Sequence, residues 1–489
     1  MKTRLLTAVC LSLAFGATCL ARQDAAVEAS KLELQGQFKQ SAGLLSTALQ
    51  DKSLPAAERQ KLEFELDRLN RIKLDFPLTK AELFADLKDS VKNLTADEYE
   101  KWLKEDRFDY RDIDGTRYYM TDSVRNLYMR YPELEARRIH PKDSAAVGKA
   151  RMESIHSIKS AALAAQTPYV LPKRFHVVMT VTAKADAAPA GETIRAWLPV
   201  PRQYPFQGEF ALTATFPPVK QLDDAQSPIR SVYMEQQAQA GKSTQFKIEY
   251  DYTTRGVWFD PKPDIARPCG PNDRAAMEYT REGPHVLFTP ELRKLSQQIV
   301  GNETNPYWKA RKCYDWISEH ILYSYAIEYS TIRNISDYCR SKGYGDCGQE
   351  ALLFIALCRL NGVPARWQSG WDIFPGVKSN HDWSEIYLAP YGWMPVDPYM
   401  GLWTMHYANT LTPEQKRELR NFYFGGLDQY RLIANSDHSQ ALRPPKHTMR
   451  SDDVDFQRGE LECGDKNLYF DQFSHSLSAT EVPLPAAKP

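Results

Sequence analysis

Three residues between Cys347 and Pro398 have the types and the order of a thiol catalytic triad. Cys347 offers a sulfur nucleophile, and His381 offers a base that could take its proton. Asp397 offers a carboxylate that could hold the imidazole in one tautomer. We predict that Cys347, His381 and Asp397 are the catalytic residues.

A buried helix should present the cysteine. Asp346 is a good N-cap residue, and Gln349 follows it at the spacing of a capping box. Residues 351–360 are almost all apolar, and Asn361-Gly362 with Pro364 marks the end of the helix. Cys347 then lies in the first turn, where free N–H groups and the helix dipole favour a thiolate. The charge of Asp346 acts in the opposite direction, so a cationic histidine partner is needed.

A hairpin should bring the base and the carboxylate together. Residues 363–371 have strand composition, as do residues 381–388 and 393–397, and Pro390-Tyr391-Gly392 is typical of a turn. The arm that carries His381 is longer than the arm that ends at Asp397. We therefore expect a bulge or a wide loop in the hairpin.

These motifs resemble those of the transglutaminase-like superfamily, which has a papain-like fold. The matching stretches are Gly345-Asp346-Cys347, residues 362–366 (Gly-Val-Pro-Ala-Arg), residues 381–385 (His-Asp-Trp-Ser-Glu) and residues 392–398 (Gly-Trp-Met-Pro-Val-Asp-Pro). The resemblance covers roughly residues 290–405, and it implies that Cys347 is the nucleophile, His381 the base and Asp397 its orienting group. Gly348 departs from the animal cross-linking enzymes, which carry Trp at this position, so the resemblance favours the broader bacterial branch.

Two other interpretations concern residues near the triad. A zinc site built from Cys339, Cys347, Cys358 and His381 would lack any Cys-x-x-Cys pair, so we expect no metal and no cofactor. Tyr323 and Tyr325 could complete an oxyanion hole from upstream.

The net charge of the chain and its N-terminal sequence indicate which partners it binds and where it is located. The chain has 62 acidic and 62 basic residues, so it shows no electrostatic preference for nucleic acid. Residues 1–21 have the pattern of a cleaved signal peptide, and the Thr before Cys19 departs from a lipoprotein motif. No later apolar run could span a bilayer. We expect an exported protein, periplasmic or extracellular, in which disulfides are possible and Cys358 is a buried free thiol.

The remaining sequence predicts an α+β multidomain protein. We expect a helical region at 22–170, a β-sandwich domain at 171–270, a papain-like, transglutaminase-like core at 271–410 and a C-terminal extension at 411–489 that packs on the core. Capping pairs Thr79–Glu82 and Thr95–Glu98 mark helix starts in the first region. In the extension, strands are expected near residues 454–456 and 468–470.

The predicted function is that of an exported thiol enzyme that acts on an amide bond through an acyl-enzyme. Hydrolysis, as in a peptidase or amidase, is favoured because water is always present; transfer to an amine, as in a transglutaminase, is the alternative. Peptides, proteins, peptidoglycan stem peptides and glycosylated asparagine all present suitable amides. An alternative from another class is a non-catalytic protein of the same fold that binds a glycan or a protein.

Overall fold

The computed structural model describes residues 25–140, 145–270 and 273–485, which form two compact units that divide after Pro141. The predicted signal peptide lies outside the described residues. Among the residues described, no helix is long and apolar enough to cross a membrane.

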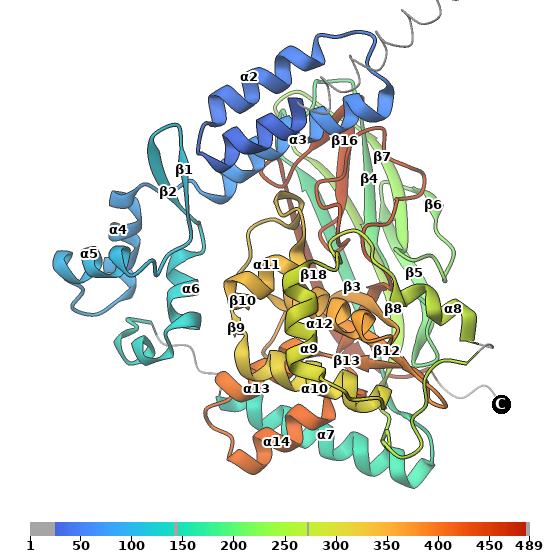
Figure 1. Cartoon of the computed structure of the whole chain (residues 1–489). Helices are drawn as coiled ribbons and strands as arrows, with labels where there is room; N and C mark the ends of the chain where they lie inside the picture. Colours follow the sequence, from blue (N-terminus) through green and yellow to red (C-terminus); the bar gives the residue numbers. More distant parts are fainter. Residues whose placement is uncertain (1–24, 141–144, 271–272, 486–489) are drawn as a thin grey trace, which may run out of the picture. The chain divides into compact units, whose positions relative to one another are not determined.

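The first unit is mainly helical (Figure 1). It contains α2 (Phe38–Leu49), α3 (Ala56–Asp75), α4 (Lys80–Ser90), α5 (Ala96–Lys104), α6 (Ser123–Arg130), the 3-10 helix η1 (Pro132–Arg137) and a hairpin of β1 (Tyr110–Ile113) and β2 (Thr116–Tyr119). Thr79 and Glu82 form the predicted capping box of α4, and the Thr95 side chain accepts the N–H of Glu98 at the start of α5. The capping signals in the sequence therefore marked these two helix starts correctly.

Two five-stranded sheets make up much of the second unit (Figure 1). One sheet has the order β14-β8-β3-β18 with β5 paired to β8, and the other has the order β17-β16-β4-β7-β6. Their strands are β3 (Tyr169–Ala183), β4 (Thr193–Pro199), β5 (Gln207–Phe216), β6 (Val219–Leu222), β7 (Ser231–Gln237), β8 (Thr244–Trp258), β14 (Gly426–Leu427), β16 (Glu460–Cys463), β17 (Lys466–Leu468) and β18 (Phe473–Val482).

Both sheets contribute to one hydrophobic core. Val177 and Phe246 come from the first sheet, and Val232 and Leu461 come from the second. The strands β16, β17 and β18 belong to the last part of the chain, so residues 460–482 complete sheets that begin near residue 169. The strand expected at 454–456 is wrong, because these residues lie in an irregular loop; strand β17 ends at Leu468.

A smaller sheet carries the candidate site. Its order is β13-β12-β11-β15, from β11 (Ala365–Asp372), β12 (Ser379–Leu388), β13 (Gly392–Val396) and β15 (Arg431–Asn435). Helix α12 (Cys347–Leu360) packs on β11 and β12 and on α9 (Pro290–Val300), α10 (Pro306–His320), α11 (Ile335–Lys342) and α13 (Pro398–His406). The other elements of this unit are α7 (Ala145–Ala165), α8 (Arg274–Met277), η3 (Glu278–Thr280), β9 (Leu322–Tyr323), η4 (Tyr329–Thr331), β10 (Tyr344–Gly345) and α14 (Pro413–Phe422).

Candidate active site

Cys347 is the first residue of the buried helix α12, as the sequence predicted. The N-cap Asp346 accepts the backbone N–H of Gln349 at 3.1 Å, and every residue of the helix before Leu360 is buried. A helix that is surrounded by protein on all sides needs an apolar composition, as residues 351–360 have. The helix start is therefore fixed within the protein and cannot fray into solvent.

His381 and Asp397 form a buried pair. The imidazole Nε2 lies 2.8 Å from Asp397 Oδ2, and the two side chains are 3% and 0% exposed. Strand pairing between β12 and β13 runs from Leu388–Gly392 to Ser384–Val396 without a register shift. The expected bulge is absent from this ladder, because Asp397 leaves the strand and caps α13 while its side chain reaches back to the imidazole.

Asp397 is held at three points. Its Oδ1 accepts the N–H of Met400 at 3.0 Å, and its Oδ2 also lies 3.0 Å from Arg431 Nη2. Burial alone would raise the pKa of Asp397, but the charges of His381 and Arg431 and the bond from His381 hold it below its ordinary value. The carboxylate therefore stays ionised and its orientation is fixed on every side.

The thiol has a different hydrogen-bond partner from the one that the sequence suggested. Cys347 Sγ donates to Asp382 Oδ2 at 3.6 Å, and among the described residues no hydrogen bond joins the thiol to His381. Asp382 follows His381 on β12, and its Oδ1 accepts from Gln457 Nε2 at 2.7 Å. The same Gln457 Nε2 donates to the carbonyl of His381 at 3.0 Å, so one amide positions both neighbours.

This environment disfavours the thiolate. Burial, then the charges of Asp382 and Asp346, raise the pKa of Cys347 well above its usual range. The helix N-terminus was expected to favour the thiolate, but burial and two carboxylates outweigh that effect. Burial and the nearby Asp346 also raise the pKa of Asp382 well above normal, which favours its protonated form.

Gly348 has no room for a side chain. A Cβ atom there would lie 2.1 Å from the Tyr329 hydroxyl and 2.8 Å from Asp382 Oδ2. Tyr329 is fixed in place, since its hydroxyl donates to Asp346 Oδ1 at 2.7 Å. The position that carries Trp in cross-linking enzymes is thus closed by two side chains of this site.

A cavity of about 280 Å³ opens beside the thiol. Tyr323 and Tyr325 line it together with Cys347, so both oxyanion-hole candidates border the same cavity as the thiol. The ring of His381 makes an edge contact with Tyr399, whose ring in turn contacts Tyr323. The wall of the cavity is completed by residues of the loop between β15 and β16.

That loop supplies site residues that the sequence did not reveal. Asp452, Asp455, Gln457 and Arg458 all line the cavity. They come from a stretch without regular structure, more than 50 residues beyond Asp397, and no spacing rule connects them to the triad. The one signal in the sequence was the high density of polar residues in this part of the C-terminal extension.

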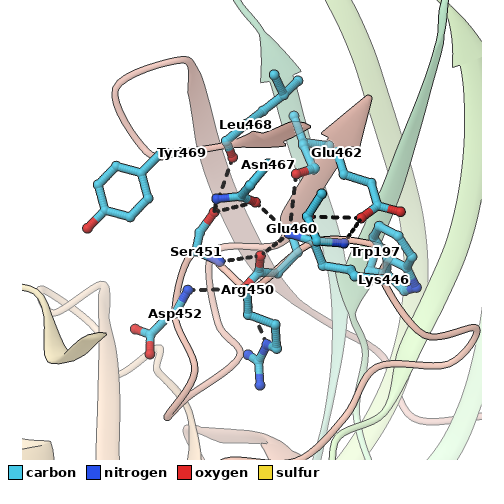
Figure 2. Close-up of polar contacts among 12 residues, drawn as sticks. Trp197, Lys446, Arg450, Ser451, Asp452, Glu460, Glu462, Asn467, Leu468 and Tyr469 are labelled. Atoms are coloured by element: carbon cyan, nitrogen blue, oxygen red, sulfur yellow. Dashed lines mark hydrogen bonds and ion pairs between the residues drawn. The ribbon is translucent and has the colours of Figure 1, made fainter. Parts of the chain in front are cut away.

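A buried polar network anchors the loop to β16 and β17 (Figure 2). Glu460 accepts from Lys446 Nζ at 2.8 Å and from the backbone N–H of Ser451 at 2.7 Å. Asn467 accepts from the same Lys446 at 2.6 Å. Lys446 and Glu460 are almost fully buried, so their ion pair ties the loop to β16.

The described cysteines are all free thiols: Cys269, Cys313, Cys339, Cys347, Cys358 and Cys463. Cys358 is fully buried in α12, as predicted. Within the described part of the chain, no group of three or more His, Cys, Asp or Glu side chains is arranged to hold a metal ion.

Comparison with known proteins confirms the resemblance seen in the sequence. Residues 293–398 match the family described as the transglutaminase-like superfamily. A curated protein of Haemophilus influenzae, described as uncharacterised, is 24% identical over 143 residues, which cover 24% of this chain and 39% of that protein.

Two solved structures are also similar in part. A candidate cysteine protease from Cytophaga hutchinsonii is 14% identical, with a TM-score of 0.42, over 65% of this chain and 93% of the other. The periplasmic domain of TgpA from Pseudomonas aeruginosa is 16% identical, with a TM-score of 0.26, over 48% of this chain and 91% of the other.

Proposed function

We propose that the transglutaminase-like domain at residues 293–398 is the catalytic centre of an exported thiol enzyme that hydrolyses an amide bond. The observation that carries the proposal is the buried His381–Asp397 pair, at 2.8 Å, in which His381 directly precedes Asp382, whose carboxylate accepts from the Cys347 thiol. A binding scaffold has no physical need for an ionised carboxylate, clamped by Arg431 and a helix N-terminus, behind a histidine. A general base does need that arrangement.

The chemistry follows from the roles of these three residues. His381 takes the proton of the Cys347 thiol, and the sulfur attacks the carbonyl carbon of the amide. The C–N bond then breaks, the His381 imidazolium protonates the departing amine, and the acyl group remains on sulfur as a thioester. Water, deprotonated by His381, attacks the thioester and releases the acid and the free thiol.

The hydrogen bond between the thiol and Asp382 must be exchanged before the first step. Substrate that fills the cavity would displace it and leave the thiol to the imidazole. We propose that the structure represents the resting enzyme, in which a thiol of raised pKa is protected until substrate binds. A protected thiol suits an exported protein, because the oxidation of cysteine proceeds through the thiolate.

Mass spectrometry of intact protein and products tests the proposal. The purified protein is incubated with a peptide and muropeptide library, with and without an added primary amine. We expect hydrolysis products and a transient acyl adduct on Cys347, and neither with Cys347→Ala. Cys269→Ala, which changes a free cysteine outside the cavity lining, should behave as wild type.

The same experiment separates the alternatives. Products joined to the added amine would identify an acyltransferase. Tight capture of one library member by Cys347→Ala and wild type alike, without turnover by either, would identify a binding protein and refute the enzyme.

Export is tested separately. The N-terminal sequence of protein from the native host should begin near Arg22, and an intact Met1 would refute the proposed export.

A further inference from the structure

The cavity beside Cys347 is strongly acidic. Five carboxylates line it, and Arg458 is the single Lys, Arg or His side chain among its described lining residues. Arg458 donates to Glu328 at 2.8 and 2.6 Å and to Asp452 at 3.2 Å. Its charge is therefore already matched, and the acid groups of Asp346, Asp382 and Asp455 have no further cation among the described lining residues.

Asp455 has no partner of its own. It is 6% exposed and lines the cavity, and among the described residues no hydrogen bond or ion pair reaches its carboxylate. Its backbone, by contrast, is bonded on both sides, by Asp452 Oδ1 and by Arg450. A buried carboxylate normally has a partner, because burying an unpaired charge is unfavourable. The backbone of Asp455 is therefore held at the cavity wall.

Neighbouring carboxylates make the absence of a partner for Asp455 more unfavourable. Burial, then the charges of Asp452 and Asp382, raise the pKa of Asp455 well above its usual range. A cation in the cavity would reverse that effect for all three carboxylates at once. The described carboxylates are not arranged as a metal site, so an organic cation fits the cavity better than a metal ion does.

We propose that this cavity binds a protonated primary amine of the substrate, with Asp455 as its direct counter-ion. The tyrosines at positions 323, 325 and 329 add ring surfaces that attract cations, and about 280 Å³ is close to the lower limit of small-ligand sites. The ammonium is a recognition group and not the attacking amine, because its lone pair holds the proton. The inference rests on the proposed function, since it names the substrate class of the same site.

Charged thiol reagents test the cavity without any catalysis. Aminoethyl methanethiosulfonate is a cation, and its hydroxyethyl analogue is neutral. With each, the sulfur of Cys347 forms a mixed disulfide and methanesulfinate leaves. Peptide mapping separates Cys347 from the other thiols. The ratio of cationic to neutral rate is divided by the same ratio for mercaptoethanol, which removes the intrinsic difference between the reagents.

We expect a corrected ratio of about ten or more for wild type, since ~1.4 kcal/mol of added attraction gives a factor of ten. Asp455→Asn should lower the ratio several-fold. Asp453→Asn is the matched control, because Asp453 belongs to the same loop but lies outside the cavity lining, and its ratio should equal that of wild type. A wild-type ratio near one, or equal losses in both variants, overturns the inference.

Amide substrates then show where the amine lies. Alanyl coumarinylamide has only an α-ammonium, Nα-acetyl-lysyl coumarinylamide has only a side-chain ammonium, and the acetyl-norleucyl analogue has neither. Cleavage of the first places the amine at the substrate N-terminus, and cleavage of the second places it on a side chain. Equal cleavage of the uncharged analogue overturns the inference. If no amide is cleaved while the labelling ratio stays high, the hydrolase proposal fails and the cation site stands.

Discussion

Gly348→Ala should damage the site through a single methyl group. The added Cβ would lie 2.1 Å from the Tyr329 hydroxyl, whereas ordinary contact begins near 3.4 Å. The hydroxyl must therefore retreat by more than 1 Å, and because it is attached to a rigid ring, its 2.7 Å bond to Asp346 breaks. Asp382, at 2.8 Å from the same Cβ, blocks the other direction.

The cost follows from three contributions. Overpacking a buried site costs about 1–3 kcal/mol, and loss of a hydrogen bond to a charged group costs about 1.5–3 kcal/mol. Alanine is favoured over glycine in a helix by about 1 kcal/mol, which offsets part of the loss. We expect the free energy of unfolding to fall by about 1.5–5 kcal/mol in total.

Urea denaturation followed by tryptophan fluorescence measures this change. Every tryptophan of the chain except Trp102 belongs to the second unit, so the signal reports mainly on the unit that contains Gly348. Gly148→Ala is the control within the second unit, because its Cβ would meet neighbours at 3.5 Å or more in helix α7, and we expect a small gain in stability. In a Tyr329→Phe background the closest atom is gone, so Gly348→Ala should cost clearly less. A cost that is the same in both backgrounds, or a Gly348→Ala variant as stable as wild type, would refute the reasoning.

Three further predictions concern the charges around the site. Asp382→Asn should shift the pH profile of Cys347 alkylation by iodoacetamide to lower pH, because the charge of Asp382 ranks next after burial in raising the thiol pKa; an unchanged profile would mean that burial alone sets it. Arg431→Met should lower the free energy of unfolding by about 3 kcal/mol, since it leaves the buried Asp397 with His381 as its remaining cationic partner; denaturation at neutral pH measures this, and an equal or higher stability would contradict it. The pKa of Asp452 is raised to about 6, chiefly by burial, so the folded protein binds the extra proton and stability should fall as pH rises from about 4 to 6. Asp452→Asn should flatten that part of the pH–stability curve by at most about 3 kcal/mol, and a curve parallel to that of wild type would count against the shift.

Local parts of the site could be predicted from the sequence because local physics determines them. The start of α12, its end near Asn361 and the hairpin that carries His381 and Asp397 follow from capping residues, turn residues and apolar periodicity. The match at residues 293–398 shows that the combined motifs were specific.

The contacts between distant segments could not be predicted. Arg431 reaches Asp397, and Gln457 reaches Asp382, through the pairing of β15 with β11 and the anchoring of an irregular loop. Neither depends on a repeat or a spacing that one sequence reveals. The state of the thiol was missed for the same reason, because burial and the carboxylate of Asp382 appear once the chain is folded.

The late position of strands β16, β17 and β18 in the chain affects when the site can form during synthesis. A ribosome delivers a chain from its N-terminus, so Cys347, His381 and Asp397 emerge before residues 436–482. Until those residues arrive, both large sheets lack strands, and Gln457 does not yet hold His381 and Asp382. The amide-cleaving site that we propose is therefore completed only after residues 436–482 have been delivered.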